Sequence, residues 1–165
     1  MNIYLTGMMG SGKTTIGKAL ASSIKYPFFD LDKKIEEYTG KSINNLFLED
    51  GEKYFRKLES QMLQKNIPPS IVSCGGGVIT IKKNCDYILN NGTVVFLHAS
   101  IEELSKRLKR TKKRPLLKKS DLIESLQNIW KSRMVSYNKH SHLKVDTTNK
   151  SITEIITQIK ESLEI

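Results

Sequence analysis

Cysteine is scarce in this sequence, because 165 residues include only Cys74 and Cys85. Their spacing fits neither a disulfide framework nor a structural zinc site, so it favours a reducing compartment, and we expect a cytoplasmic protein. No apolar run approaches the roughly 20 residues that cross a bilayer. The first residues form a strand-like run without a basic segment or a small-residue cleavage site, which predicts no signal peptide.

Internal repeats and Pro/Ser-rich linkers are also missing, and the length predicts a single domain over residues 1–165. Acidic residues are in the minority, since 27 Lys and Arg stand against 17 Asp and Glu, a net charge of +10. Residues 106–119 hold nine Lys or Arg and no acid. Basic surfaces suit nucleic acids, anionic lipids or phosphorylated metabolites. Because this run lacks interleaved aromatic residues, we expect no nucleic acid as a partner, and we expect no membrane either.

Short apolar runs alternate with stretches of helical periodicity along the whole chain. Strands are expected at residues 3–5, 28–32, 71–73, 94–97 and 143–145. This alternation predicts an α/β fold, a parallel sheet with helices on both faces. Ligands of such sheets bind beyond the carboxyl ends of the strands. We therefore expect the loops at residues 7–14, 30–32 and 75–77, and the loop after residue 97, to share one rim.

The loop at Gly7–Thr14 matches G-x-x-x-x-G-K-[ST], with a predicted strand before it and a predicted helix after it. Its glycines let backbone N–H groups point at phosphate oxygens, and the helix N-terminus adds partial positive charge. We expect Lys13 to reach the β- and γ-phosphates of a nucleotide and the Thr14 hydroxyl to ligate Mg²⁺. The predicted nucleotide-binding residues here are Gly10, Ser11, Gly12, Lys13, Thr14 and Thr15. The alternative is a glycine-rich turn without a ligand, and the motif alone does not separate kinases from ATPases or GTPases.

Asp30 and Asp32 close the second predicted strand. In an extended segment, side chains two residues apart face the same way. One carboxylate would orient the hydration shell of Mg²⁺, and the other would accept a hydrogen bond from an attacking hydroxyl. The alternative is that Asp32 only caps the following helix.

Arg56 and Glu59 are three residues apart on a predicted helix, where an ion pair is ordinary. A solvated surface pair is the default interpretation. The phosphate loop and the aspartate pair favour another one, in which Arg56 binds a substrate carboxylate with its two-pronged guanidinium.

Together these motifs resemble the shikimate kinases over residues 7–147. The matching segments are Gly10–Thr14, Asp30-x-Asp32, Gly51-Glu52-x-x-Phe55-Arg56-x-x-Glu59, Ser73-x-Gly75-Gly76-Gly77, Arg114–Leu117, Arg133-x-x-x-Tyr137 and Val145–Thr147. The resemblance implies a three-layer α/β/α P-loop kinase fold with a central five-stranded parallel sheet and a mobile lid at roughly residues 109–121. It implies transfer of the ATP γ-phosphate to the 3-hydroxyl of shikimate, a step toward chorismate, with Mg²⁺ as cofactor. We expect a monomer that binds ATP and shikimate.

The resemblance also implies roles for residues on the acceptor side. Asp32 would bind the ring hydroxyls and serve as the base, while Asp30 would support Mg²⁺ through water. Arg56 and Arg133 would hold the substrate carboxylate, with Glu59 keeping Arg56 in place. Backbone N–H groups of Gly75, Gly76 and Gly77 would help, chiefly Gly76, and Phe47 and Phe55 would wall the ring.

On the nucleotide side, Arg114 would reach the transferred phosphate from the lid, so that the implied catalytic residues are Lys13, Asp32 and Arg114. Arg110 and the Asp146-Thr147 pair would flank adenine. The chain departs from some relatives in a shorter segment between Arg110 and Arg114 and in the absence of a proline at residues 149–151. Two other interpretations are a gluconate- or nucleotide-type kinase on the same fold and a nucleotide-binding module without turnover.

Overall fold

The computed structural model describes residues 1–65, 68–110 and 122–165. Five parallel strands form one sheet in the order β2-β3-β1-β4-β5. The strands are β1 (Asn2–Thr6), β2 (Phe28–Asp30), β3 (Ile71–Ser73), β4 (Gly92–His98) and β5 (Leu143–Asp146). The prediction of an α/β fold with a five-stranded parallel sheet is confirmed.

Helices connect the strands. In a parallel sheet the chain must cross back to the end where strands begin before it can form the next one, and a helix usually makes this crossover. They are α1 (Lys13–Ser23), α2 (Leu31–Thr39), α3 (Ile43–Glu49), α4 (Gly51–Leu63), α5 (Lys82–Asn91), α6 (Ile101–Arg110), α7 (Leu122–Lys139), α8 (Ile152–Leu163) and the short 3₁₀ turn η1 (Val78–Thr80). In the described parts of the chain, no helix is both long enough and apolar enough to cross a membrane.

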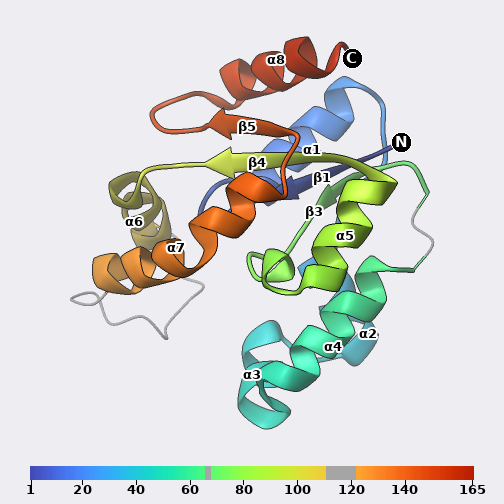
Figure 1. Ribbon diagram of the computed structural model, residues 1–165, viewed down its shortest axis with the longest axis vertical. Helices are drawn as coiled ribbons and strands as arrows, with labels where there is room; N and C mark the ends of the chain where they lie inside the picture. The colour runs from blue at the N-terminus through green and yellow to red at the C-terminus, as the bar shows by residue number, and fades with distance from the viewer. Residues whose placement is uncertain (66–67, 111–121) are drawn as a thin grey trace.

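The sheet is covered on both faces, which gives three layers (Figure 1). On one face α1 and α8 pack against the strands, and their side chains Ile16, Leu20 and Ile155 join Leu5 and Val95 in one apolar cluster. On the other face lie α5 and α7, together with the α2–α4 group. Side chains alternate along a strand, so neighbouring residues of β1 serve different layers.

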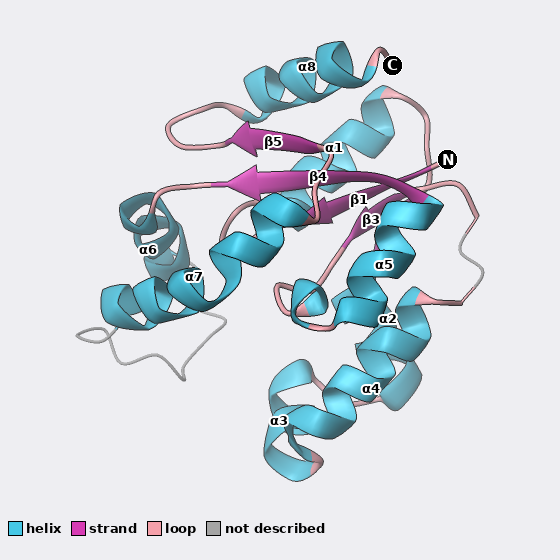
Figure 2. Ribbon diagram, in the orientation of Figure 1, coloured by secondary structure: helices cyan, strands magenta, loops and turns pink. Residues whose placement is uncertain are grey.

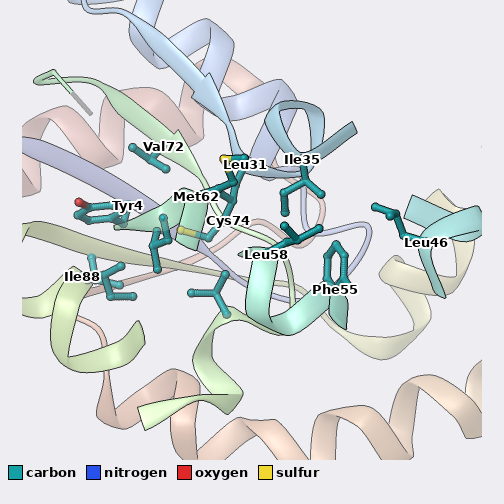
Figure 3. Close-up of a cluster of buried hydrophobic side chains, with 13 residues drawn as sticks. Tyr4, Leu31, Ile35, Leu46, Phe55, Leu58, Met62, Val72, Cys74 and Ile88 are labelled. Carbon is teal, nitrogen blue, oxygen red and sulfur yellow. The ribbon is translucent and has the colours of Figure 1, made fainter. Parts of the chain in front are cut away.

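The largest buried cluster of the described residues lies between the sheet and the helices on this second face, and Figure 3 shows it. Tyr4 of β1 and Val72 of β3 contribute from the sheet, while Leu31, Phe55 and Leu58 contribute from α2 and α4. This cluster fixes α2 and α4 against the carboxyl end of the sheet. Because all five strands are parallel, the loops that follow β1, β2, β3 and β4 lie along one rim, as expected. Figure 2 shows β4 and β5 pointing in the same direction.

Two Ser-x-x-Glu segments begin helices but behave differently. At α8 the capping box is complete, because the Ser151 hydroxyl accepts from the Glu154 N–H at 3.2 Å and Glu154 accepts from the Ser151 N–H at 2.7 Å. At α6 the Ser100 hydroxyl accepts from the Glu103 N–H at 3.2 Å. The carboxylate of Glu103 accepts instead from Nε of Arg107, at 2.8 Å. Only half of a capping box therefore forms at α6.

Candidate active site

The loop between β1 and α1 has the geometry of a phosphate cradle. Gly12 occupies the cap position of α1 with a φ of +96°, in the left-handed region that favours glycine. The helix then begins at Lys13, so the N–H groups of its first turn face the loop. The ammonium of Lys13 donates to the carbonyl oxygens of Gly7 and Met8, at 2.9 Å each. These contacts hold its positive charge over the loop.

Thr14, Asp30 and Ser73 bring hydroxyl and carboxylate oxygens together beside this loop. The Thr14 hydroxyl donates to Oδ2 of Asp30 at 2.8 Å and lies 3.5 Å from the Ser73 hydroxyl. Hard oxygen ligands of this kind suit Mg²⁺, which commonly binds through one or two protein oxygens plus water and substrate phosphates. The donor set therefore fits the predicted ion, and Thr14 and Asp30 could supply its protein oxygens.

The prediction that Asp30 and Asp32 share an extended segment is wrong. Oδ1 of Asp30 accepts from the Lys33 N–H at 3.2 Å, which makes Asp30 the N-cap of α2 and places Asp32 in the first helical turn. The alternative role of Asp32 as the cap is wrong for the same reason. The two carboxylates therefore lie in different places. Asp30 contacts Thr14 beside the phosphate loop. Asp32 lies against the turn after β3, where its Oδ1 would be 2.9 Å from a Cβ on Gly75.

Glu59 is fully buried beneath this turn. Its Oε2 accepts from Nη1 of Arg56 at 2.8 Å, and a Cβ on Gly75 would overlap its Oε1. Burial raises the pKa of Glu59, and the positive charge of Arg56 opposes that shift. This ion pair is the contact by which Glu59 would hold Arg56 in place, as predicted from the resemblance.

The guanidinium of Arg56 is held on several sides. Nε and Nη2 each lie 3.3 Å from Oε1 of Glu52, and the group lies 5.1 Å from the ring centre of Phe55. Phe47 stands beside Phe55, with ring centres 4.7 Å apart. Among the described residues, these contacts use one N–H of each terminal nitrogen, so each retains another for a ligand.

Arg133 and Tyr137 of α7 meet the triple glycine from the opposite side. Nη1 of Arg133 donates to the Gly76 carbonyl oxygen at 3.1 Å, and the Tyr137 hydroxyl donates to the same oxygen at 2.7 Å. A Cβ on Gly76 would lie 3.8 Å from Nη1 of Arg133 and 3.5 Å from the Gly7 carbonyl oxygen. The space above Gly76 is thus bordered by the phosphate loop and by Arg133.

Arg107 contacts the phosphate loop, which the sequence did not reveal. Its Nη2 donates to the Thr147 carbonyl oxygen at 2.6 Å, and its Nη1 lies 3.1 Å from the Thr147 hydroxyl and 3.4 Å from the Gly10 carbonyl oxygen. One guanidinium therefore joins α6, the phosphate loop and the loop after β5. In the sequence, Arg107 shows only as a helical neighbour of Glu103 within a basic run.

Arg110, which was predicted to flank adenine, is exposed at the end of α6. Arg114 and most of the predicted lid lie outside the described residues. Their assigned roles stay predictions, as does the role of Thr15, which is exposed in the first turn of α1.

The family model and the curated relatives described here give one family. A family model described as shikimate kinase matches residues 9–164. A relative named shikimate kinase from Bacillus cereus (strain G9842) is 40% identical, covering 99% of each chain. Another of that name from Rippkaea orientalis is 41% identical over 99% of this chain and 88% of its own.

Solved structures agree. Shikimate kinase from Acinetobacter baumannii, determined in complex with shikimate, is 33% identical with a TM-score of 0.92 over 99% of this chain and 93% of that one. The enzyme from Bacteroides thetaiotaomicron is 32% identical with a TM-score of 0.93 over 100% and 99%. A gluconokinase from Sinorhizobium meliloti, at 18% identity over 99% and 95% of the two chains and a TM-score of 0.55, shares the fold alone.

Proposed function

The chain belongs to the shikimate kinase family and is an ATP-dependent phosphotransferase that acts on a hydroxyl of shikimate, and from this premise we propose which of its residues carry the reaction. The observation that supports the assignment most strongly is the space above Gly76, bordered by the phosphate loop and by Arg133. A donor phosphate and an acceptor carboxylate bound there would be neighbours.

On the acceptor side, Arg56 and Arg133 bind the substrate carboxylate. Each terminal nitrogen of Arg56 retains an N–H for it, and two guanidinium groups offset the nearby negative charge of Glu59. The N–H groups of Gly75, Gly76 and Gly77 complete this site. Asp32 receives the ring hydroxyl that reacts.

On the donor side, the phosphate loop and Lys13 hold the nucleotide, with Thr14 and Asp30 on the side of Mg²⁺. When bound, Mg²⁺ neutralises charge on the β- and γ-phosphate oxygens. In the transfer, the substrate oxygen forms a bond to the γ-phosphorus as the bond from that phosphorus to the bridging oxygen breaks. The electron pair leaves with ADP, and the hydroxyl proton passes to Asp32. Lys13 and Arg114 stabilise the charge that moves during this step.

We assign Arg107 to the nucleotide side, because it ties Thr147 to the phosphate loop. Asp146 and Thr147 would then meet adenine on a loop that Arg107 holds. A single domain over residues 1–165, a monomeric state, a cytoplasmic location and the absence of nucleic-acid or membrane partners are further parts of the proposal.

Replacement of Arg56 tests the acceptor side. Arg56→Ala should raise the shikimate KM by about 30-fold, since hydrogen bonds to a charged ligand are lost, and should leave the ATP KM within about twofold. Arg56→Lys is the matched variant, because it keeps a positive charge beside buried Glu59 but loses the planar fork. It should preserve the thermal midpoint better and still bind shikimate weakly. Equal losses for both substrates in both variants would contradict the carboxylate role.

A further inference from the structure

The turn that follows β3 contains three consecutive glycines, Gly75–Gly77. Glycine has the widest backbone freedom of any residue, so an ordered run of three needs contacts from outside itself. In the described part of the chain, the N–H groups of Gly76 and Gly77 take part in no hydrogen bond. The Val78 N–H closes the turn by donating to the Gly75 carbonyl oxygen at 3.1 Å, but this bond leaves the plane of the central peptide, between Gly76 and Gly77, to be fixed by contacts from outside.

One face of α7 supplies the missing contacts. Residues 133, 136 and 137 are spaced three and four apart, so their side chains project from the same side of the helix. Arg133 and Tyr137 both donate to the Gly76 carbonyl oxygen, at 3.1 and 2.7 Å. Ser136 donates to the Ile79 carbonyl oxygen at 2.6 Å, in η1, which follows the turn. The helix thus contacts the turn at Gly76 and the following η1 at Ile79.

Tyr137 is the more constant of the two donors to Gly76. Its side chain is buried and its ring stacks on Phe96, with centres 4.8 Å apart and planes 3° apart. Burial raises the pKa of Tyr137 to about 12, so the hydroxyl remains a protonated donor at neutral pH. Arg133 has a second task, because a carboxylate bound to its guanidinium competes with the Gly76 oxygen for the same N–H groups.

We propose that Tyr137 is a positioning residue for the acceptor, whose hydroxyl holds the Gly76 carbonyl and thereby fixes the plane of the peptide between Gly76 and Gly77. The carbonyl and N–H of one peptide point in opposite directions, so holding the oxygen toward α7 aims the Gly77 N–H away from α7. An accepted hydrogen bond also polarises the peptide, which makes that N–H a better donor. The inference rests on the proposed role of the glycine turn in carboxylate binding.

Tyr137→Phe is the test, since it removes one oxygen and keeps the ring on Phe96. We expect the shikimate KM, and the shikimate Kd measured by titration calorimetry without ATP, to rise about tenfold, with the ATP KM within about twofold of wild type. Tyr4→Phe is the matched control. It removes another buried tyrosine hydroxyl, one that accepts from Asn2 at 3.2 Å, and should change neither KM.

The two readouts separate positioning from general stability. If Tyr137→Phe changes the thermal midpoint no more than Tyr4→Phe does and weakens shikimate alone, the proposal is supported. Unchanged shikimate binding, or equal losses for shikimate and ATP, would overturn it. Arg56→Ala separates this proposal from the one on which it rests. If that variant binds shikimate as tightly as the wild-type protein does, the proposed carboxylate site itself is refuted, whatever Tyr137→Phe shows.

Discussion

At the scale of single residues, the three glycines after β3 differ in what an added side chain would meet. A Cβ on Gly75 would overlap Glu59, and one on Gly77 would overlap the Arg56 guanidinium. A Cβ on Gly76 would meet only ordinary contacts, of which the shortest is 3.5 Å to the Gly7 carbonyl oxygen. Alanine at 75 or 77 would therefore displace the Glu59 carboxylate or the Arg56 guanidinium, whereas alanine at 76 would displace neither.

This difference predicts opposite behaviour for two small substitutions. Gly76→Ala should keep the thermal midpoint within about 2 °C of wild type while lowering kcat/KM for shikimate at least about tenfold, because the methyl group would enter the proposed acceptor site. Gly77→Ala should destabilise the protein as well, since Arg56 must move. Thermal unfolding and steady-state kinetics measure both effects. Full activity in Gly76→Ala would contradict the placement of the acceptor above this residue.

Arg107 and Arg110 are alternative candidates for the nucleotide side. Arg107→Ala should raise the ATP KM about tenfold without changing the shikimate KM, because the loop at Thr147 loses its tie to the phosphate loop. Arg107→Lys should recover part of the loss, and Lys106→Ala, an exposed neighbour, should have no effect. The result that would contradict this assignment is a larger rise in ATP KM for Arg110→Ala than for Arg107→Ala.

Some of these residues were predictable from the sequence and others were not. Lys13, Thr14 and Arg56 lie in contiguous motifs whose spacing indicates the chemistry. Arg107 contacts Thr147, 40 positions later in the chain, and no local pattern records such a contact. Tyr137 was recognisable as part of a motif, but its bond to the Gly76 carbonyl exists only once α7 packs beside the turn.

At the scale of elements, the two Ser-x-x-Glu segments show how tertiary contacts change a local rule. The spacing is the same at Ser100 and Ser151, yet only Ser151 forms the reciprocal box. At α6 the carboxylate of Glu103 accepts from Arg107, and the Ser100 N–H donates to the Thr148 hydroxyl at 3.0 Å. Similarly, β2 ends at Asp30 because that side chain caps α2, whereas the sequence predicted a strand that continued to residue 32.

The complete box at α8 predicts a pH-dependent contribution to stability. Hydrogen bonds from Ser151 hold the pKa of Glu154 below its usual value, so the contact is present above the ordinary glutamate pKa and is lost as pH falls through the lowered one. Ser151→Ala should lower the thermal midpoint at pH 7 by about 3 °C, and the difference from wild type should shrink toward pH 3. A difference that is independent of pH would show that the bond from the Ser151 hydroxyl to the Glu154 carboxylate contributes nothing.

At the scale of the whole molecule, strand order determines which loops meet. β1 lies at the centre, between β3 and β4, so the phosphate loop has the glycine turn on one side and the start of α6 on the other. The alternation of apolar runs predicted a parallel sheet and its shared rim. It did not predict that β2 and β3 would neighbour each other, because strand order depends on contacts between distant segments.

The proposed sites lie on several elements of this one arrangement. The Asp30 carboxylate comes from β2, Arg56 from α4, Gly76 from the turn after β3 and Arg133 from α7. Their mutual positions depend on the buried cluster around Tyr4 and Phe55, which packs α4 against the sheet (Figure 3). Substrate selection is therefore a property of the assembled domain rather than of one motif.

The most direct test of the account is acceptor-dependent release of ADP from ATP and Mg²⁺ by the purified protein. Shikimate, gluconate and nucleoside monophosphates are compared as acceptors, with Lys13→Ala as the inactive control. We predict turnover with shikimate that is at least about a hundredfold faster than with the other acceptors, and its loss in Lys13→Ala. Turnover with gluconate or a nucleotide but not with shikimate, or shikimate turnover that survives in Lys13→Ala, would contradict the account.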